Sequence, residues 1–216
     1  MAAMTSRFVL RGLCTALLSA CSGDEGVAPG EPSFASVASR VALAGSDHLD
    51  WADLGPPTSS HPQPITIRSN SGLSVVLTNS VLPPGNSPTP FNRATQNFFS
   101  GWRGNFALGD ELIYTGGPQI ITIDFPGPIV AAGMQVQPGS LVVAFTIRVE
   151  ALSAQGAALA FFDVSGVSTN AEDNSAPFVG IRATGGSFDK VRITNLTSMS
   201  FPGIAINQVD FTPAAR

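Results

Sequence analysis

Apolar and polar residues alternate along much of the second half of the chain. In the segment 120–125, three apolar side chains fall on one side of an extended backbone, and Thr122 and Asp124 fall on the other. The segments 141–151 and 188–194 show the same alternation. A period of two residues predicts β-strands in a sheet that has one buried and one exposed face.

Turn residues separate these runs at short intervals. The chain contains 22 glycines and 17 prolines, and they gather with small polar residues at 70–72, 83–86, 116–118, 138–139 and 185–186. The alanine-rich segment 151–160 is the one candidate helix, but Gly156 indicates a hairpin between strands 141–151 and 157–164 instead. We therefore expect an all-β fold, an antiparallel β-sandwich of the jelly-roll type.

The first residues have the features of a bacterial export signal. Residues 1–11 contain two arginines and no acid, and the apolar run 12–20 that follows is too short to span a bilayer, which takes about 20 residues. Residues 18–21, Leu-Ser-Ala-Cys, resemble the bacterial lipobox, whose cysteine is acylated and becomes the new N-terminus. An ordinary cleaved signal, with Cys21 incidental, is the alternative.

These features predict the organisation of the chain. Residues 1–20 are expected to form a lipoprotein signal peptide, 21–45 a flexible tether rich in glycine, proline and acids, and 46–216 the sandwich domain. The run 34–44 within the tether is mildly apolar and fits either a short helix or a first strand. Ser22 after the cysteine matches the proteobacterial pattern for the outer membrane, so we expect a lipid-anchored protein of the bacterial cell envelope.

The composition allows a folded core and excludes one class of partner. Hydrophobic residues make up 44% of the chain and charged residues 12%, so a core is expected and global disorder is not. Without residues 1–20, nine basic and 15 acidic residues remain, and Lys190 is the single lysine. Nucleic-acid binding needs clustered cations that neutralise phosphates. It is therefore excluded, and the expected partners are the membrane and a glycan or envelope protein.

Three stretches are rich in glycine and aromatic residues: DHLDWADLG at 47–55, GWRGNFALGDELIYT at 101–115, and SAPFVGI at 175–181 with FPGIAINQVDF at 201–211. They resemble a group of exported bacterial jelly-roll domains, often found with PEP-CTERM-type sorting tails and similar in shape to carbohydrate-binding modules. The resemblance covers roughly residues 46–213 and implies a β-sandwich outside the cytoplasm. No sorting tail follows, so Cys21 is expected to take its place as the anchor.

Trp102 and Tyr114 are the candidate ligand-binding residues, because aromatic rings stack on sugar rings in carbohydrate-binding modules. Trp51 is a weaker candidate of the same kind. The chain has two tryptophans and one tyrosine against 14 phenylalanines, and such a set is also typical of core filling. Both interpretations stay open.

No cofactor is required by the sequence, and a structural Ca²⁺ is the one for which it offers candidate ligands: Asp47, Asp50, Asn207 and Asp210. Oxygen ligands near the paired termini of a jelly roll suit a hard cation. The alternative for Asn207 is an amide that pins backbone groups. Residue parity in the last strand places Asn207 with Val209 and Phe211, facing inward, which leaves Asp210 facing solvent. A bulge near Asn207, which would bury both Ile206 and Val209, is the alternative.

No catalytic centre emerges from the sequence. The only histidines are His48 and His61, and no G-x-S-x-G motif accompanies them. We expect a non-catalytic protein with an adhesive or structural binding role at the cell envelope. The first alternative is a carbohydrate-binding module, and the second is a glycosidase or polysaccharide lyase, which needs two carboxylates about 5–10 Å apart.

The lipid anchor can be tested directly. We expect Cys21→Ser to release the protein from the membrane fraction or to leave an unprocessed precursor, because the thiol is the only atom that can carry the thioether lipid. Metabolic labelling with a palmitate analogue measures the acylation, and Cys14→Ser is the matched control. Absence of label on the unaltered protein would contradict the prediction.

Overall fold

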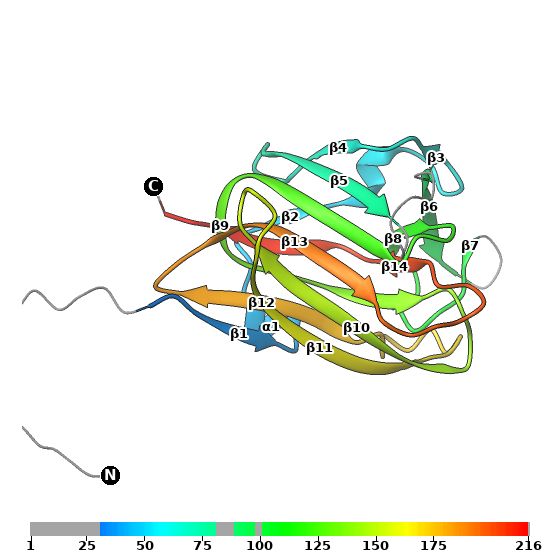
Figure 1. Ribbon diagram of the computed structural model, residues 1–216. Coiled ribbons are helices and arrows are strands. Elements are labelled where there is room, and N and C mark those ends of the chain that lie inside the picture. Colours follow the sequence, from blue (N-terminus) through cyan, green and yellow to red (C-terminus); the bar gives the residue numbers. More distant parts are fainter. Residues whose placement is uncertain (1–30, 81–88, 98–100, 216) are drawn as a thin grey trace, which may run out of the picture. The chain divides into compact units, whose positions relative to one another are not determined.

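The fold consists almost entirely of strands, as the alternation predicts (Figure 1). The computed structural model describes residues 31–80, 89–97 and 101–215, and residues 31–216 form one compact unit. Of the described residues, 57% lie in strands and 5% in helices, which confirms the all-β antiparallel sandwich. None of the helices described is long and apolar enough to cross a membrane. Cys21 lies outside the described residues.

The longest strand, β9 (Ile120–Pro138), belongs to both layers of the sandwich. Its first part, residues 120–124, pairs with β5 (Ser74–Ser80) and β13 (Phe188–Asn195). Its second part pairs with β12 (Phe178–Thr184) on one side and with two strands from the end of the chain on the other. Figure 1 shows the green strand turning at the left of the view, where residues 126–128 read Pro-Gly-Pro.

The first layer continues outward from β9 in both directions. Its order is β4 (Ile65–Arg68), β5, β9, β13, β10 (Val143–Leu152) and β11 (Ala158–Ser168), with neighbours antiparallel. The predicted strands at 120–125, 141–151 and 188–194 therefore lie in β9, β10 and β13. Gly156 lies in the β10–β11 turn with a positive φ of 85°, as the predicted hairpin requires.

The second layer surrounds the later part of β9. Its strands are β1 (Ser33–Val37), β12, β15 (Val209–Pro213), β2 (Asp47–Leu49), β14 (Ile204–Ile206), β8 (Glu111–Thr115), β6 (Phe91–Gln96), β3 (Ser60–His61) and β7 (Gly101–Trp102). The pairing is antiparallel except between β6 and β7. Two short helices, α1 (Arg40–Leu43) and η1 (Trp51–Leu54), connect the first strands.

The core lies between the layers, and the second part of β9 is covered on both faces. Ala132, Met134 and Val136 belong to the main core, whereas Ala131 packs on the other side against α1 and Phe178. A strand buried on both faces loses the polar positions that make an alternating pattern. This explains why the sequence pattern indicated strand only as far as residue 125.

Gly133 shows how closely the chain packs at this point. A Cβ atom on this residue would lie 2.7 Å from the Cε1 and Cζ atoms of the Phe178 ring. Glycine is therefore required for β12 to pair with β9 at this position.

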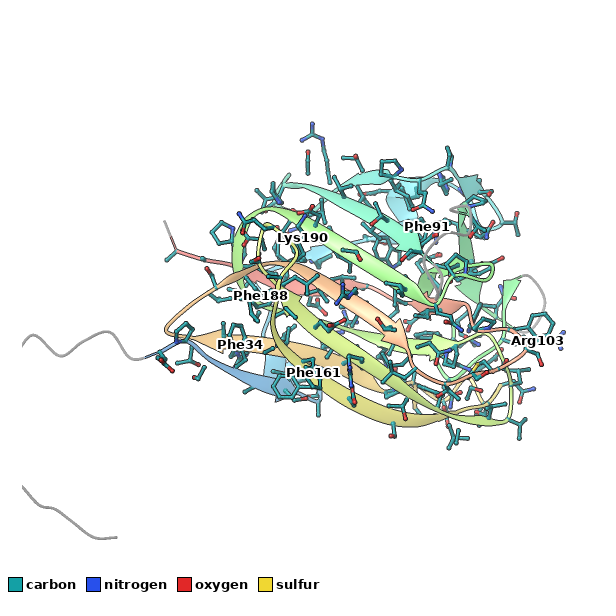
Figure 2. The ribbon with its side chains drawn as sticks, viewed as in Figure 1. Phe34, Phe91, Arg103, Phe161, Phe188 and Lys190 are labelled. Atoms are coloured by element: carbon teal, nitrogen blue, oxygen red, sulfur yellow. The ribbon has the colours of Figure 1, made fainter. Side chains whose placement is uncertain are left out.

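The structure corrects the predicted domain boundary, because part of the segment 21–45 belongs to the fold. Strand β1 pairs along its whole length with β12. The Phe34 ring packs against Phe188, with 6.4 Å between the ring centroids, and both are labelled in Figure 2. Ser39 caps α1, and Leu43 is buried. The sandwich begins near residue 33, and the mildly apolar run 34–44 forms a strand followed by a helix.

The closing segment is not one continuous strand, and it follows the alternative with an irregularity near Asn207. It breaks at residues 207–208 into β14 and β15, so Ile206 and Val209 are both buried. Asn207 and Phe211 are buried as predicted. The expectation for Asp210 was wrong, because its side chain is buried. Its Oδ2 forms an ion pair with Nη1 of Arg40 on α1, at a distance of 2.7 Å. The alternation of inward and outward residues did not predict this, because the break at residues 207–208 interrupts it. In addition, α1 covers the face of β15 that was expected to meet solvent.

Two phenylalanines provide a matched test of the core. Phe211 is fully buried, 4.9 Å from Phe125 between ring centroids, whereas Phe201 is 69% exposed in a loop. We expect Phe211→Ala to lower the free energy of unfolding by about 3–5 kcal/mol, the usual cost of truncating a core phenylalanine. Phe201→Ala should change it by less than about 0.5 kcal/mol. Urea denaturation measures both, and a Phe211→Ala protein as stable as the original would contradict the fold.

Candidate functional site

A polar cleft of about 350 Å³ lies where the break in the closing segment meets β9. Three of its lining residues are Trp51, Ala107 and Gly109, and the other eight are polar: Arg40, Asp50, Asp110, Glu111, Gln135, Asn174, Asn207 and Gln208. They come from α1, η1, the loop before β8, β8 itself, β9, the loop before β12 and the β14–β15 break. We call this site the polar cleft.

Asn207 forms the floor of the polar cleft. Its Oδ1 accepts a hydrogen bond of 2.9 Å from the backbone N–H of Gln135, and its Nδ2 donates to Gln135 Oε1 at 2.6 Å and to Asp110 Oδ2 at 3.1 Å. Because the ladder is interrupted at the strand break, the Asn207 side chain supplies the partner that the Gln135 N–H needs. The predicted backbone-pinning role of Asn207 is therefore confirmed.

Gln135 connects this floor to the rim. Its Nε2 donates to Asn174 Oδ1 at 2.8 Å and to the carbonyl oxygen of Ala176 at 3.0 Å. Gln135 and Asn207 thus hold each other's side chains in fixed orientations. The segment 126–138 is otherwise apolar apart from Gln137, and a polar residue in such a run is the one sequence signal for this site.

Among the described residues that line the cleft, Arg40 is the one cation, and its contacts belong to the fold. Arg40 forms the ion pair with Asp210, and its Nη2 donates to Asn207 Oδ1 at 3.3 Å and to the Gln208 carbonyl at 3.2 Å. Burial raises the pKa of Asp210 more than the nearby Arg40 guanidinium lowers it. This pair fastens α1 over the strand break, and it leaves the cleft with an excess of acceptor oxygens.

The carboxylates of the cleft are held by neighbouring groups. Asp50 Oδ1 accepts from the Ala52 N–H at 2.9 Å and caps η1, and Glu111 Oε2 binds Arg93 and Thr95. No histidine or cysteine is among the lining residues that the structure describes. The amide hydrogens of Asn207 and Gln135 are already used within the fold. The polar cleft therefore offers mainly fixed acceptor oxygens, an arrangement that suits hydroxyl groups better than acid–base chemistry.

Trp102 and Tyr114 lie together but outside this cleft. Their ring centroids are 5.3 Å apart at an interplanar angle of 48°, and both half-buried rings pack against a small second core that includes Phe106 and Leu112. This packing is what the core-filling interpretation expects. Their role as a sugar platform stays a prediction. Trp51 is fully buried, so it offers no exposed ring face.

The four predicted calcium ligands do not share one site. Asp50 and Asn207 line the polar cleft, whereas Asp47 and Asp210 do not. Asp47 Oδ1 accepts from the N–H groups of His48 and Ser71, and its Oδ2 accepts from Ser69 Oγ at 2.6 Å and from Ser71 Oγ. In the described part of the chain, no three His, Cys, Asp or Glu side chains gather closely enough to hold a metal ion.

The chain matches no protein-family model and no curated protein. Among solved structures, a DUF4465 family protein from Bacteroides caccae is 7% identical, with a TM-score of 0.42 over 77% of this chain and 100% of its own. CsCBM6-3 from Clostridium stercorarium, in complex with cellobiose, is 14% identical, with a TM-score of 0.25 over 79% of this chain and 95% of its own.

The K3 cleaved adhesin domain of Lys-gingipain from Porphyromonas gingivalis is also 14% identical, with a TM-score of 0.30 over 76% of this chain and 97% of its own. All three TM-scores lie below 0.5. The function is therefore argued from the residues of this chain.

Asp47 should stabilise the fold through hydrogen bonds and without a metal. Burial raises its pKa, but the bonds from Ser69, Ser71 and the backbone outweigh burial, and the pKa ends below its usual 3.8. The ionised carboxylate therefore contributes stability above about pH 3.8, and this contribution is lost as the pH falls through the lower pKa of the folded state.

We expect Asp47→Asn to lower the free energy of unfolding at pH 7 by about 1–3 kcal/mol, because an amide NH₂ would face groups that donate. The loss should be equal in calcium and in EDTA, and the acid-induced loss of stability should be smaller than in the original protein. Asp53→Asn, an exposed neighbour, is the control. A loss seen only with calcium present would show that Asp47 binds the ion.

Proposed function

We propose that this chain is a lipid-anchored binding module of the bacterial cell envelope, which holds a saccharide in the polar cleft without reacting with it. The observation that carries the proposal is the Gln135–Asn207 pair, whose side-chain amides are fixed by mutual hydrogen bonds on the floor of the cleft. Binding groups that are already ordered lose little conformational entropy when a ligand arrives.

The chemistry of the lining supports a hydroxyl-rich and neutral ligand. Each sugar hydroxyl both donates and accepts, so it pairs well with a site that mixes amides and carboxylates. Asp50, Asp110 and Glu111 supply acceptors, and Arg40, the one cation among the lining residues that the structure describes, is held by Asp210. An anionic ligand would meet three carboxylates and no free cation among the lining residues, so it is disfavoured.

The same contacts favour binding over catalysis. A glycosidase needs one carboxylic acid that gives up a proton and a second carboxylate that attacks or activates water. Here Glu111 is held by Arg93 and Thr95, Asp50 caps η1, and Asp110 accepts from Asn207. These contacts keep the side chains in place, which suits an adhesive role in which the ligand is held and not cleaved.

The proposed anchor fits the start of the sandwich. Cys21 is followed by 11 residues, 22–32, before β1 begins at Ser33. Extended chain covers at most roughly 3.5 Å per residue, so this tether would hold the domain within about 40 Å of the lipid surface. At that distance the domain meets the glycans of the envelope, and the outer membrane is the location that we propose.

A glycan array on residues 22–216, with and without calcium, tests the proposed ligand class. Asp110→Ala should weaken binding to the best glycan at least about tenfold, because a hydrogen bond to a charged group contributes about 1.5–3 kcal/mol. Asp189→Ala, at a half-buried aspartate outside the cleft, is the control. Isothermal titration calorimetry measures both, and circular dichroism confirms that they fold.

Two results would refute the proposed function. The first is an array on which no glycan binds the domain. The second is an Asp110→Ala protein that binds the glycan as tightly as the original, which would place the ligand elsewhere.

A further inference from the structure

Strand β11 forms one edge of the first layer, and its only ladder partner in the described residues is β10 (Figure 1). It is 11 residues long and contains no proline and no lysine. Exposed edges of natural sheets are usually blunted by such residues or by short strands, because an open edge pairs readily with another chain. β11 is long, and it has no proline or lysine that would hinder pairing with another chain.

The outer face of β11 is apolar for an exposed strand. Leu159 is 44% exposed, and Phe161 and Val167 are each 55% exposed. Figure 2 shows Phe161 on this strand at the margin of the layer. The single charge on β11, Asp163, is bound by the Arg148 guanidinium in two hydrogen bonds of 2.8 and 2.9 Å. The β11 edge is therefore long and apolar, and Arg148 compensates the charge of its one aspartate.

We propose that β11 pairs antiparallel with β11 of a second copy of this chain, about a two-fold axis at Val164, so that the two first layers form one continuous sheet. An antiparallel strand pairs with itself across a two-fold axis without any other symmetry requirement, and two-fold dimers are the commonest homo-oligomers. The proposal does not depend on the ligand of the polar cleft.

The β11 sequence is complementary to itself when it runs antiparallel. This favours a second copy of the chain as the partner, and it also favours one register. An axis at Val164 places Phe161 opposite Val167 of the second copy and Asp163 opposite Ser165, on the outer face. On the inner face it places Phe162 opposite Gly166, where the Phe145 ring and Pro177 of the same copy already lie against the backbone. Pairs of an aromatic and a β-branched residue stabilise antiparallel neighbours.

Neighbouring registers lose these pairs. An axis at Asp163 would place the two Asp163 carboxylates directly opposite each other, which is unfavourable. An axis at Ser165 would move Phe161 opposite position 169, beyond the end of β11 at Ser168. An axis that falls between two consecutive residues would pair the buried face of one copy with the exposed face of the other.

A single introduced cysteine tests the register. Residues 22–216 contain no cysteine and include the whole described core, so an added thiol is the only one. Opposite residues of an antiparallel pair have Cα atoms about 4.5–5.5 Å apart, within the range of a disulfide. Val164→Cys should form a disulfide-linked dimer on mild oxidation. Leu159→Cys, on the same strand but far from its counterpart in this register, should not.

Sedimentation velocity over a concentration series tests the association itself. The original protein and Leu159→Lys should sediment as dimers, and Val167→Lys should raise the dimer dissociation constant at least about tenfold, because a lysine would face Phe161. Leu159 and Val167 are similarly exposed, so neither substitution removes core packing, and circular dichroism checks this. A monomeric original protein, or equal effects of the two lysines, would overturn the proposal, as would cross-linking by Leu159→Cys alone.

Discussion

Strand β9 pairs with strands of both layers, and the rest of the sandwich depends on that double pairing. Residues 120–124 hold β5 and β13, and the later part holds β12, β14 and β15. The change of layer takes place near the Pro-Gly-Pro sequence at 126–128, where two prolines remove ladder donors. Most strands of the fold therefore find their register, directly or through one neighbour, along a single backbone.

The polar cleft follows from the same arrangement. Two strands, β14 and β15, share one side of β9, and the register shifts by one residue between them, where the ladder breaks at residues 207–208. The break leaves Gln135 facing Asn207, and their amides satisfy each other instead of a regular ladder. Helix α1 then closes the break through the Arg40–Asp210 ion pair. The result is a polar cleft beside strands whose side chains are otherwise buried.

The sequence predicted the sheet better than the site. Strands with one exposed face, such as β10 and β13, show apolar residues at a period of two. Gly156 indicated the hairpin that joins β10 to β11. The later part of β9 is buried on both faces, so no alternation marks it. The cleft joins residues 40, 110, 135 and 207, which are distant in the sequence, and only pairing brings them together. Asp210 was misplaced because parity ignores the break beside it and the helix above it.

The side-chain amide signals of Gln135 and Asn207 offer the most direct measurement of the proposed binding site. Nuclear magnetic resonance of the isotope-labelled domain, titrated with the oligosaccharide that the array identifies, reports on these two amides separately from the Trp102 indole. We expect the Gln135 and Asn207 signals to shift in proportion to site occupancy while the Trp102 signal stays in place. Shifts that gather at Trp102 and Tyr114, with the two amides unmoved, would contradict the polar cleft as the saccharide site.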